Sequence, residues 1–220
     1  MRISLGLLLV LSVMVACDSI TGASGETTMM AIKTPTVSQE EWTHHDGDDI
    51  DLAIVVPEGW ETYNTDAGIV LNEYASATVP DPTLRGILVH IFVPYIDHFS
   101  RPVTADTNMA WWVLKQVVSD PDYVGSALVS QPVAFTWDHY EAAYYLLNNR
   151  NETVTMLLAL GLPDHSNLVV CHISAPEDQS PRIRPMLSTI LGSLHINGAA
   201  IDPSSLDDLP DPLEFPQNPG

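Results

Sequence analysis

The sequence predicts an α+β domain, in which one central antiparallel sheet is flanked by helices. Several short runs are rich in the β-branched and aromatic residues that strands favour, and turn residues separate them. Two further segments place apolar residues at the 3.6-residue period of an amphipathic helix. The last strand candidates are joined by short connectors, which favour antiparallel hairpins because a parallel crossover needs about a dozen residues. With 45% apolar residues, the chain can fill the core of one globular domain.

The first half of the chain contains three strand candidates, residues 50–56, 68–74 and 86–95. The first of them runs into residues 57–60 (PEGW), which supply turn residues and an aromatic ring. The third (GILVHIFVPY) is almost continuously apolar, which predicts a strand that is buried on both faces.

Residues 104–118 predict the first helix. Its apolar face consists of Met109, Trp112, Val113 and Val117, at positions i, i+3, i+4 and i+8. Thr104 or Asp106 is expected to cap its start, and Asp120-Pro121 is expected to end it.

The second half of the chain predicts more strands and a final helix. Residues 127–136 form a short strand candidate broken at Pro132, and residues 141–147, 153–160 and 167–174 form three stronger ones. A second helix is expected from Pro181, capped by Ser180, to Asn197-Gly198. Its apolar face consists of Ile183, Met186, Leu187, Ile190, Leu191 and Leu194.

Two motifs resemble those of the PsbP/Mog1/DcrB-like domains. Residues 56–60 (VPEGW) look like the family's opening after its first strand, and residues 183–194 (IRPMLSTILGSL) look like its final helix. The elements between them come in a similar order, so the resemblance covers about residues 48–197. It implies an α/β/α sandwich around an antiparallel sheet. It also implies a binding or assembly role, with no shared catalytic residue.

The N-terminus has the layout of a secretory signal peptide. Arg2 gives it a positive charge, and residues 3–16 form an uncharged, mostly apolar run that ends in Ala16. As a helix this run would be roughly 21 Å long, which is short for a hydrocarbon core of about 30 Å. We therefore expect residues 1–16 to be a cleaved signal peptide rather than a permanent transmembrane helix.

Residues 14–17 (MVAC) resemble the lipobox of bacterial lipoproteins. In that family the cysteine sulfur receives a diacylglycerol, and the chain is cut just before the cysteine. The resemblance implies that acylated Cys17 anchors the protein to a bacterial membrane on its extracytoplasmic side, since two or more acyl chains give stable binding. An ordinary signal peptide followed by an incidental cysteine is the alternative.

After the signal peptide the chain divides into three segments. Residues 17–41 are rich in Ser, Thr and Gly, and they are predicted to form a flexible tether behind the lipidated cysteine. Residues 42–198 are predicted to form the single folded domain. Residues 199–220 combine many prolines and acidic residues with no Lys or Arg, which predicts a disordered tail.

The chain is strongly acidic, with 28 Asp and Glu against 8 Lys and Arg and a net charge of −20. Such a surface repels phosphate groups, so nucleic acid is not expected as a partner. It also repels anionic lipid headgroups, so we expect acyl chains rather than a basic patch to attach the protein to the bilayer.

Residues 44–51 (HHDGDDID) form the densest group of side chains that could ligate a divalent metal, and His44, His45, Asp46 and Asp48 are the candidate ligands. Their spacing matches no rigid metal-binding motif, and a solvated acidic segment before the first strand is the simpler interpretation. No cofactor is predicted.

Two further groups of residues are candidates for function. Trp60, Trp111 and Trp112 are the candidates for an aromatic binding surface, although packing in and beside the core explains the Trp111-Trp112 pair more simply. His139 and Glu141 would share one face of a strand and could couple as a base and its orienting group. Exposed residues at the start of a strand explain that pair more simply.

The remaining signals favour a protein without catalysis. Cys171 lies in the apolar run LVVCHI, which predicts a buried, unreactive thiol. No nucleophile elbow or phosphate-binding glycine loop occurs. We therefore expect a non-catalytic binding or assembly lipoprotein of the cell envelope, with an envelope protein as its partner. The alternatives are a metal-binding protein or metal-dependent enzyme that uses the His44 group, and a solute-capturing protein with an apolar cavity.

Overall fold

The computed structural model describes residues 41–47, 50–74, 85–97, 99–100, 107–149, 152–163 and 167–217. The predicted signal peptide and Cys17 lie outside the described residues, as does the tether up to residue 40. Asp48 and the two predicted helix caps, Thr104 and Asp106, also lie outside them.

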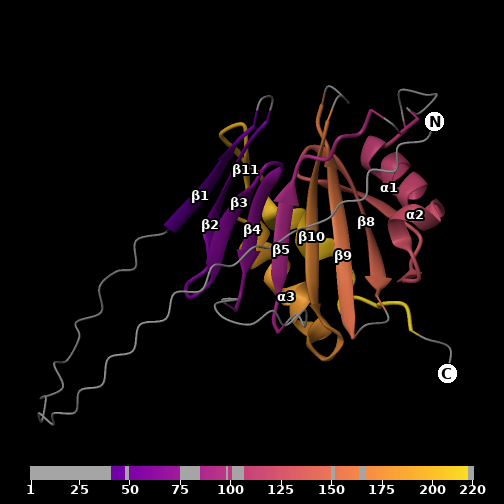
Figure 1. The fold of residues 1–220 in the computed structure, drawn as a ribbon. Helices are drawn as coiled ribbons and strands as arrows, with labels where there is room; N and C mark the ends of the chain where they lie inside the picture. The colour runs from indigo at the N-terminus through magenta and orange to yellow at the C-terminus, as the bar shows by residue number, and fades with distance from the viewer. Residues whose placement is uncertain are drawn as a thin grey trace, which may run out of the picture. The chain divides into compact units, whose positions relative to one another are not determined.

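The larger of two antiparallel sheets runs through the middle of the described structure (Figure 1). Within the described residues its strand order is β3-β4-β5-β10-β9-β8-β6, and β7 also pairs with β8. These strands are β3 (Glu61–Thr65), β4 (Gly68–Asn72), β5 (Leu88–Phe92), β6 (Leu128–Val129), β7 (Val133–Trp137), β8 (Tyr140–Asn148), β9 (Thr153–Gly161) and β10 (Leu168–Pro176). Every pair is antiparallel, which confirms the predicted fold class.

A smaller sheet, with the order β1-β2-β11-β12, was not predicted as a separate unit. Its strands are β1 (Glu41–Asp46), β2 (Asp51–Val56), β11 (His195–Ile196) and β12 (Ala199–Ala200). Asn197 and Gly198 have positive φ angles of 51° and 75°, as the turn of a tight hairpin requires. They therefore join β11 to β12 instead of ending a helix.

Successive side chains of a strand point to opposite faces of the sheet, and both faces of the large sheet carry apolar residues. Along β10, Val169, Cys171 and Ile173 belong to one core cluster, which also contains the inward side chains of α3 (Ile183–Leu191) and of β2. Leu168 and Val170 belong to a second cluster under α1 (Met109–Ser119). Figure 1 shows α1, followed by α2 (Pro121–Val124), beside β8 and α3 behind β5 and β10.

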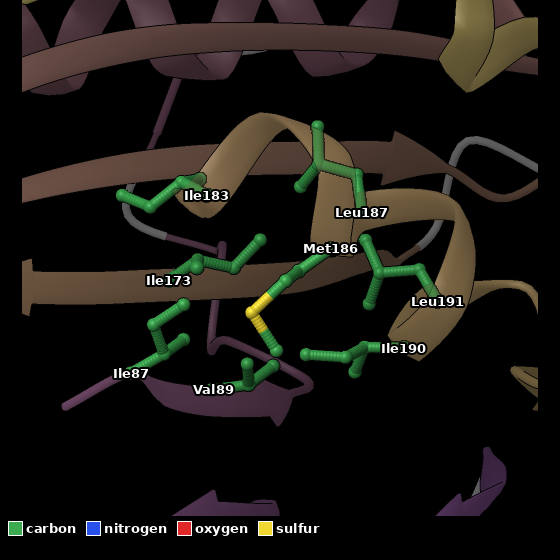
Figure 2. A pocket seen from close by; sticks show the side chains of 8 residues that line it. All are labelled: Ile87, Val89, Ile173, Ile183, Met186, Leu187, Ile190 and Leu191. Atoms are coloured by element: carbon green, nitrogen blue, oxygen red, sulfur yellow. The ribbon is translucent and has the colours of Figure 1, made fainter. Parts of the chain in front are cut away.

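The apolar face of α3 is closely packed against the large sheet. Figure 2 shows its side chains in contact with Ile87 and Val89 from the β5 region and with Ile173 from β10. The gap between them has a volume of about 10 Å³. That is room for about one water molecule, so this contact is core packing and not the apolar cavity of a solute-capturing protein.

Both helices differ from their predicted bounds. α1 begins at Met109, because the side chain of Asn108 accepts a hydrogen bond from the Trp111 N–H at 2.9 Å and caps the helix there. The second predicted helix is divided: residues Glu177–Arg182 form the 3₁₀ helix η1, and α3 ends at Leu191. Pro185 lacks an N–H, and its ring crowds the carbonyl of the residue four positions earlier, so a regular α-helix cannot extend through Pro181.

The prediction of a disordered tail is wrong for residues 199–217. This segment contains β12 and the 3₁₀ helix η2 (Pro203–Asp208), and it buries apolar side chains against the core cluster of α3. The buried side chains are Ile201, Leu206, Leu209, Leu213 and Phe215. Composition indicated disorder because prolines and acids are numerous, but the apolar residues between them are enough to fix the segment on the core.

Buried polar contacts also hold this C-terminal segment. Arg184, 8% exposed, donates hydrogen bonds from Nε and Nη2 to the carbonyl oxygens of Asp207, Leu209 and Pro210, at 2.9–3.2 Å. Trp137, which is fully buried, donates from its indole nitrogen to the carbonyl of Asp202 at 3.0 Å. The backbone carbonyls of this segment therefore accept the hydrogen bonds of two buried side chains, Arg184 and Trp137.

Cys171 is completely buried, and burial raises the pKa of its thiol to about 12. Because the thiolate is the reactive form, we expect no reaction of native Cys17→Ser protein with a thiol reagent at mildly alkaline pH. The same sample should titrate a full equivalent of thiol once it is unfolded in guanidinium. Rapid labelling of the native protein would contradict the burial of Cys171.

Candidate functional site

The candidate site is an open groove of about 360 Å³ on the outer face of the small sheet. We call it the β1–β2–β11 groove. It is lined by Trp42, His44, Asp46, Asp51, Leu52, Ala53, His195 and Gly198. Aromatic rings and carboxylates therefore share one concave surface.

Strand periodicity explains why these side chains gather. Trp42, His44 and Asp46 occupy every second position of β1 and so project from the same face. The register pairs Asp46 with Asp51 on β2 and His44 with Ala53. On the opposite face of β2, Leu52 and Ile54 are buried in the core, which leaves the outer face for the groove.

Ala53 forms the floor between two imidazoles. It pairs with His44 on β1 and with His195 on β11, so the three residues form one row across the sheet. Neighbouring strands are about 4.8 Å apart, which places the two histidine backbones roughly two strand spacings from each other. The small side chain of Ala53 lies in the middle of this row.

Trp42 lies against both imidazoles. Its ring centroid is 4.9 Å from that of His195 in an edge-on arrangement and 6.4 Å from that of His44 in a stacked one. The residue is 38% exposed. The indole therefore presents free surface at the groove.

Backbone contacts fix the position of His195. Its Nδ1 lies 3.0 Å from the carbonyl oxygen of Ser193, which can only accept a hydrogen bond, so Nδ1 carries the proton. In the neutral ring this leaves Nε2 as the acceptor. Asn197 reinforces the arrangement, since its side chain accepts from the Asp51 N–H and its own N–H donates to the Asp51 carbonyl, each at 2.8 Å.

The predicted metal-binding group is divided by β1. His44 and Asp46 line the groove, whereas His45, one position away, projects from the opposite face. Asp48 lies outside the described residues. Among the residues that the structure does describe, no three His, Cys, Asp or Glu side chains are placed to hold a metal ion together.

The three tryptophans proposed as an aromatic surface do not come together. Trp60 packs against the core cluster of α3, whereas Trp111 packs against the cluster on the opposite face of the large sheet. Trp111 donates from its indole nitrogen to the carbonyl of Pro132 at 3.2 Å, and Trp112 donates to that of Ser100 at 2.7 Å. Both residues thus attach α1 to neighbouring loops.

His139 and Glu141 do not form a pair either. His139 lies at the β7–β8 turn, its side chain is 60% exposed, and its Nδ1 is 3.0 Å from a carboxylate oxygen of Asp138. Glu141 accepts a hydrogen bond from the Met109 N–H at 2.8 Å, at the start of α1. A carboxylate there is favourable because the N-terminus of a helix carries partial positive charge, so Glu141 has a structural role.

Sequence reasoning missed Trp42 and His195 as members of the site. Trp42 was detectable, because Trp42, His44 and Asp46 alternate with the period of a strand. His195 was not detectable, since its place beside β2 depends on a pairing between segments about 140 residues apart.

Comparison with known proteins finds similar folds but no similar sequences. No protein-family model and no curated protein sequence matches the chain. The solution structure of the cyanobacterial PsbP of Synechocystis is 13% identical, with a TM-score of 0.45 over 74% of this chain and 97% of that one. A point mutant of the protein Mog1 is 13% identical, with a TM-score of 0.43 over 76% and 99% of the two chains. The Ran-binding protein Mog1p of Saccharomyces cerevisiae is 12% identical, with a TM-score of 0.41 over 76% and 99%.

These proteins belong to the group that the sequence motifs resemble, and the likeness concerns the fold alone. At such identities and TM-scores, nothing about ligand or activity follows from it. Among the described helices, none is both long and apolar enough to cross a membrane.

Proposed function

We propose that this chain is a lipid-anchored, extracytoplasmic binding protein without catalytic activity, and that the β1–β2–β11 groove is its ligand site. The observation that supports the binding role is the groove itself, where an exposed indole, two imidazoles and two carboxylates surround about 360 Å³ of open space. Its lining combines an aromatic face with charged and hydrogen-bonding groups, which suits the recognition of a ligand.

The proposed anchor is supported by the N-terminal sequence. A basic start, a short apolar run and the MVAC motif precede a segment rich in Ser, Thr and Gly. Acylation of Cys17 would hold the folded domain near a bilayer without a transmembrane helix. The acidic net charge of −20 provides no polybasic alternative for membrane attachment.

Membrane fractionation tests the anchor. We expect the wild-type protein to sediment with membranes and the Cys17→Ser variant to move to the soluble extracytoplasmic fraction, because the substitution removes the acylated sulfur. Cys171→Ser is the matched control, since it removes the buried thiol and should leave the protein on the membrane. A Cys17→Ser variant that still sediments, or an N-terminus of unmodified mass in the wild type, would contradict the lipid anchor.

A binding role also predicts that a substitution that blocks the groove abolishes function. Ala53→Trp would place a large side chain in the groove, between His44 and His195, on an outward-facing position, so the fold should survive while the groove is blocked. Protein with this change should be as abundant and as stable as the wild type but should fail to complement a strain that lacks the gene. Ala53→Ser, which leaves the groove open, should complement it. Turnover of any substrate by the purified protein would overturn the non-catalytic assignment.

The metal-binding alternative has one specific observation in its favour. His44 and His195 face the same groove, and the bond from His195 Nδ1 to the Ser193 carbonyl leaves Nε2 for a ligand, as in many metal sites. Metal analysis of the purified protein, compared with His44→Ala and His195→Ala, decides between the two functions. Metal that is lost in both variants would favour this alternative.

A further inference from the structure

The charge of the β1–β2–β11 groove restricts what it can bind. Asp46 and Asp51 face each other across β1 and β2, and no Lys or Arg lines the groove. Within the described part of the chain, neither carboxylate has a basic partner. An anionic ligand would be repelled, and a purely apolar one would remove water from two carboxylates without replacing their hydrogen bonds.

The aromatic residues of the groove restrict the class of ligand further. Trp42, His44 and His195 place three rings around the small residue Ala53, and the indole has the most electron-rich face of any side chain. Cations bind over such a face within about 6 Å of the ring centroid. A bare divalent metal is less suited, since the described residues do not place three ligands together.

We propose that the groove binds an organic ammonium group, with the cation over Trp42 and its charge balanced by Asp46 and Asp51. This inference rests on the proposed binding role and specifies the ligand class. The volume of about 360 Å³ accommodates a small quaternary or primary ammonium ion. The ammonium group is carried either by a free small molecule or by a lysine side chain of a protein partner.

Calorimetric titration of the full mature chain tests the ligand class. Choline and tetramethylammonium serve as free cations, and the peptide acetyl-Gly-Lys-Gly-amide serves as the protein-borne one. The control ligand is 3,3-dimethylbutan-1-ol, which has the shape of choline without its charge. We expect saturable binding of at least one ammonium probe, at least tenfold tighter than the neutral analogue and weaker at high salt because exposed carboxylates are screened. Preference for choline or for the peptide identifies the source of the group.

Substitutions locate the site. Trp42→Leu should weaken binding at least tenfold by removing the aromatic face, and Asp46→Asn or Asp51→Asn should each weaken it several-fold while leaving the exposed strand positions intact. Glu41→Gln is the matched control, because Glu41 is an exposed acid on the same strand that does not line the groove. Equal binding of the neutral analogue, or affinities unchanged in the Asn variants, would overturn the inference.

Failure of the ligand assignment is distinguishable from failure of the proposed function. If no ammonium probe binds while Ala53→Trp still abolishes complementation, the groove is a binding site but its ligand is not an ammonium ion. If Ala53→Trp complements fully, the groove has no role in function.

Discussion

Removing residues 202–220 should unfold the domain or lower its free energy of unfolding by about 5 kcal/mol or more. Leu206, Leu209, Leu213 and Phe215 are each at most 8% exposed, and burying such side chains contributes about 1.5–3 kcal/mol apiece. Truncation would also remove the carbonyl acceptors of the buried Arg184 guanidinium, and an unpaired buried charge is costly. A loss of this size is comparable with the whole stability of a typical domain.

Urea unfolding followed by circular dichroism measures the loss, and single substitutions keep the prediction testable if the truncated chain does not fold. Leu206, on η2, is fully buried, so Leu206→Ala should cost about 2–5 kcal/mol. Asp208→Ala is the matched control on the same 3₁₀ helix, and as an exposed substitution it should change stability by less than about 0.5 kcal/mol. A truncated chain as stable as the full one would mean that this segment is not part of the core.

The fold was predictable where the sequence carries a long apolar run bounded by turn residues. β8, β9 and β10 bury both faces at most positions and are separated by turn residues, so their bounds were found to within about one or two residues. β3 was missed because it is largely exposed and has no apolar run. β11 and β12 are two residues each, too short for any period to be read from them.

The candidate site was predictable only in part, for a related reason. His44 and Asp46 were identified by residue type, but grouping them with their sequence neighbours assumed that nearby residues converge on one ligand. A strand sends neighbours to opposite faces, so the structure replaces His45 with His195, which lies on a segment about 150 residues further along the chain. His195 joins the site through the pairing of β11 with β2, and a local sequence pattern cannot predict a pairing between distant segments.

Acidification should destabilise the protein through two histidines of the large sheet, His90 and His172, which lie directly opposite each other on β5 and β10. Burial, and to a smaller extent the neighbouring His90, lowers the pKa of His172 from its ordinary 6.5 to about 4. Burial also lowers the pKa of His90. The register continues this row through Val70 and Tyr63 on one side and through Leu157 and Tyr145 on the other. No carboxylate in the row compensates a protonated imidazole.

The direction of the effect follows from where the proton binds. Between about pH 6.5 and pH 4 the unfolded chain protonates His172 whereas the folded protein does not, so the free energy of unfolding falls as the pH falls. The contribution of His172 is fully present above pH 6.5. At about 1.4 kcal/mol per unit of pKa difference, its loss reaches on the order of 3 kcal/mol near pH 4.

Denaturant unfolding at about pH 7.5 and about pH 4.5 measures this loss, and His172→Leu separates it from the titration of the many carboxylates. The variant places an apolar side chain of similar size at a half-buried strand position. We expect the stability of the wild type to fall between the two pH values by about 2–3 kcal/mol more than that of His172→Leu. If wild type and His172→Leu lose stability in parallel, then His172 is accessible to protons in the folded state and the sheet face around it is open to water.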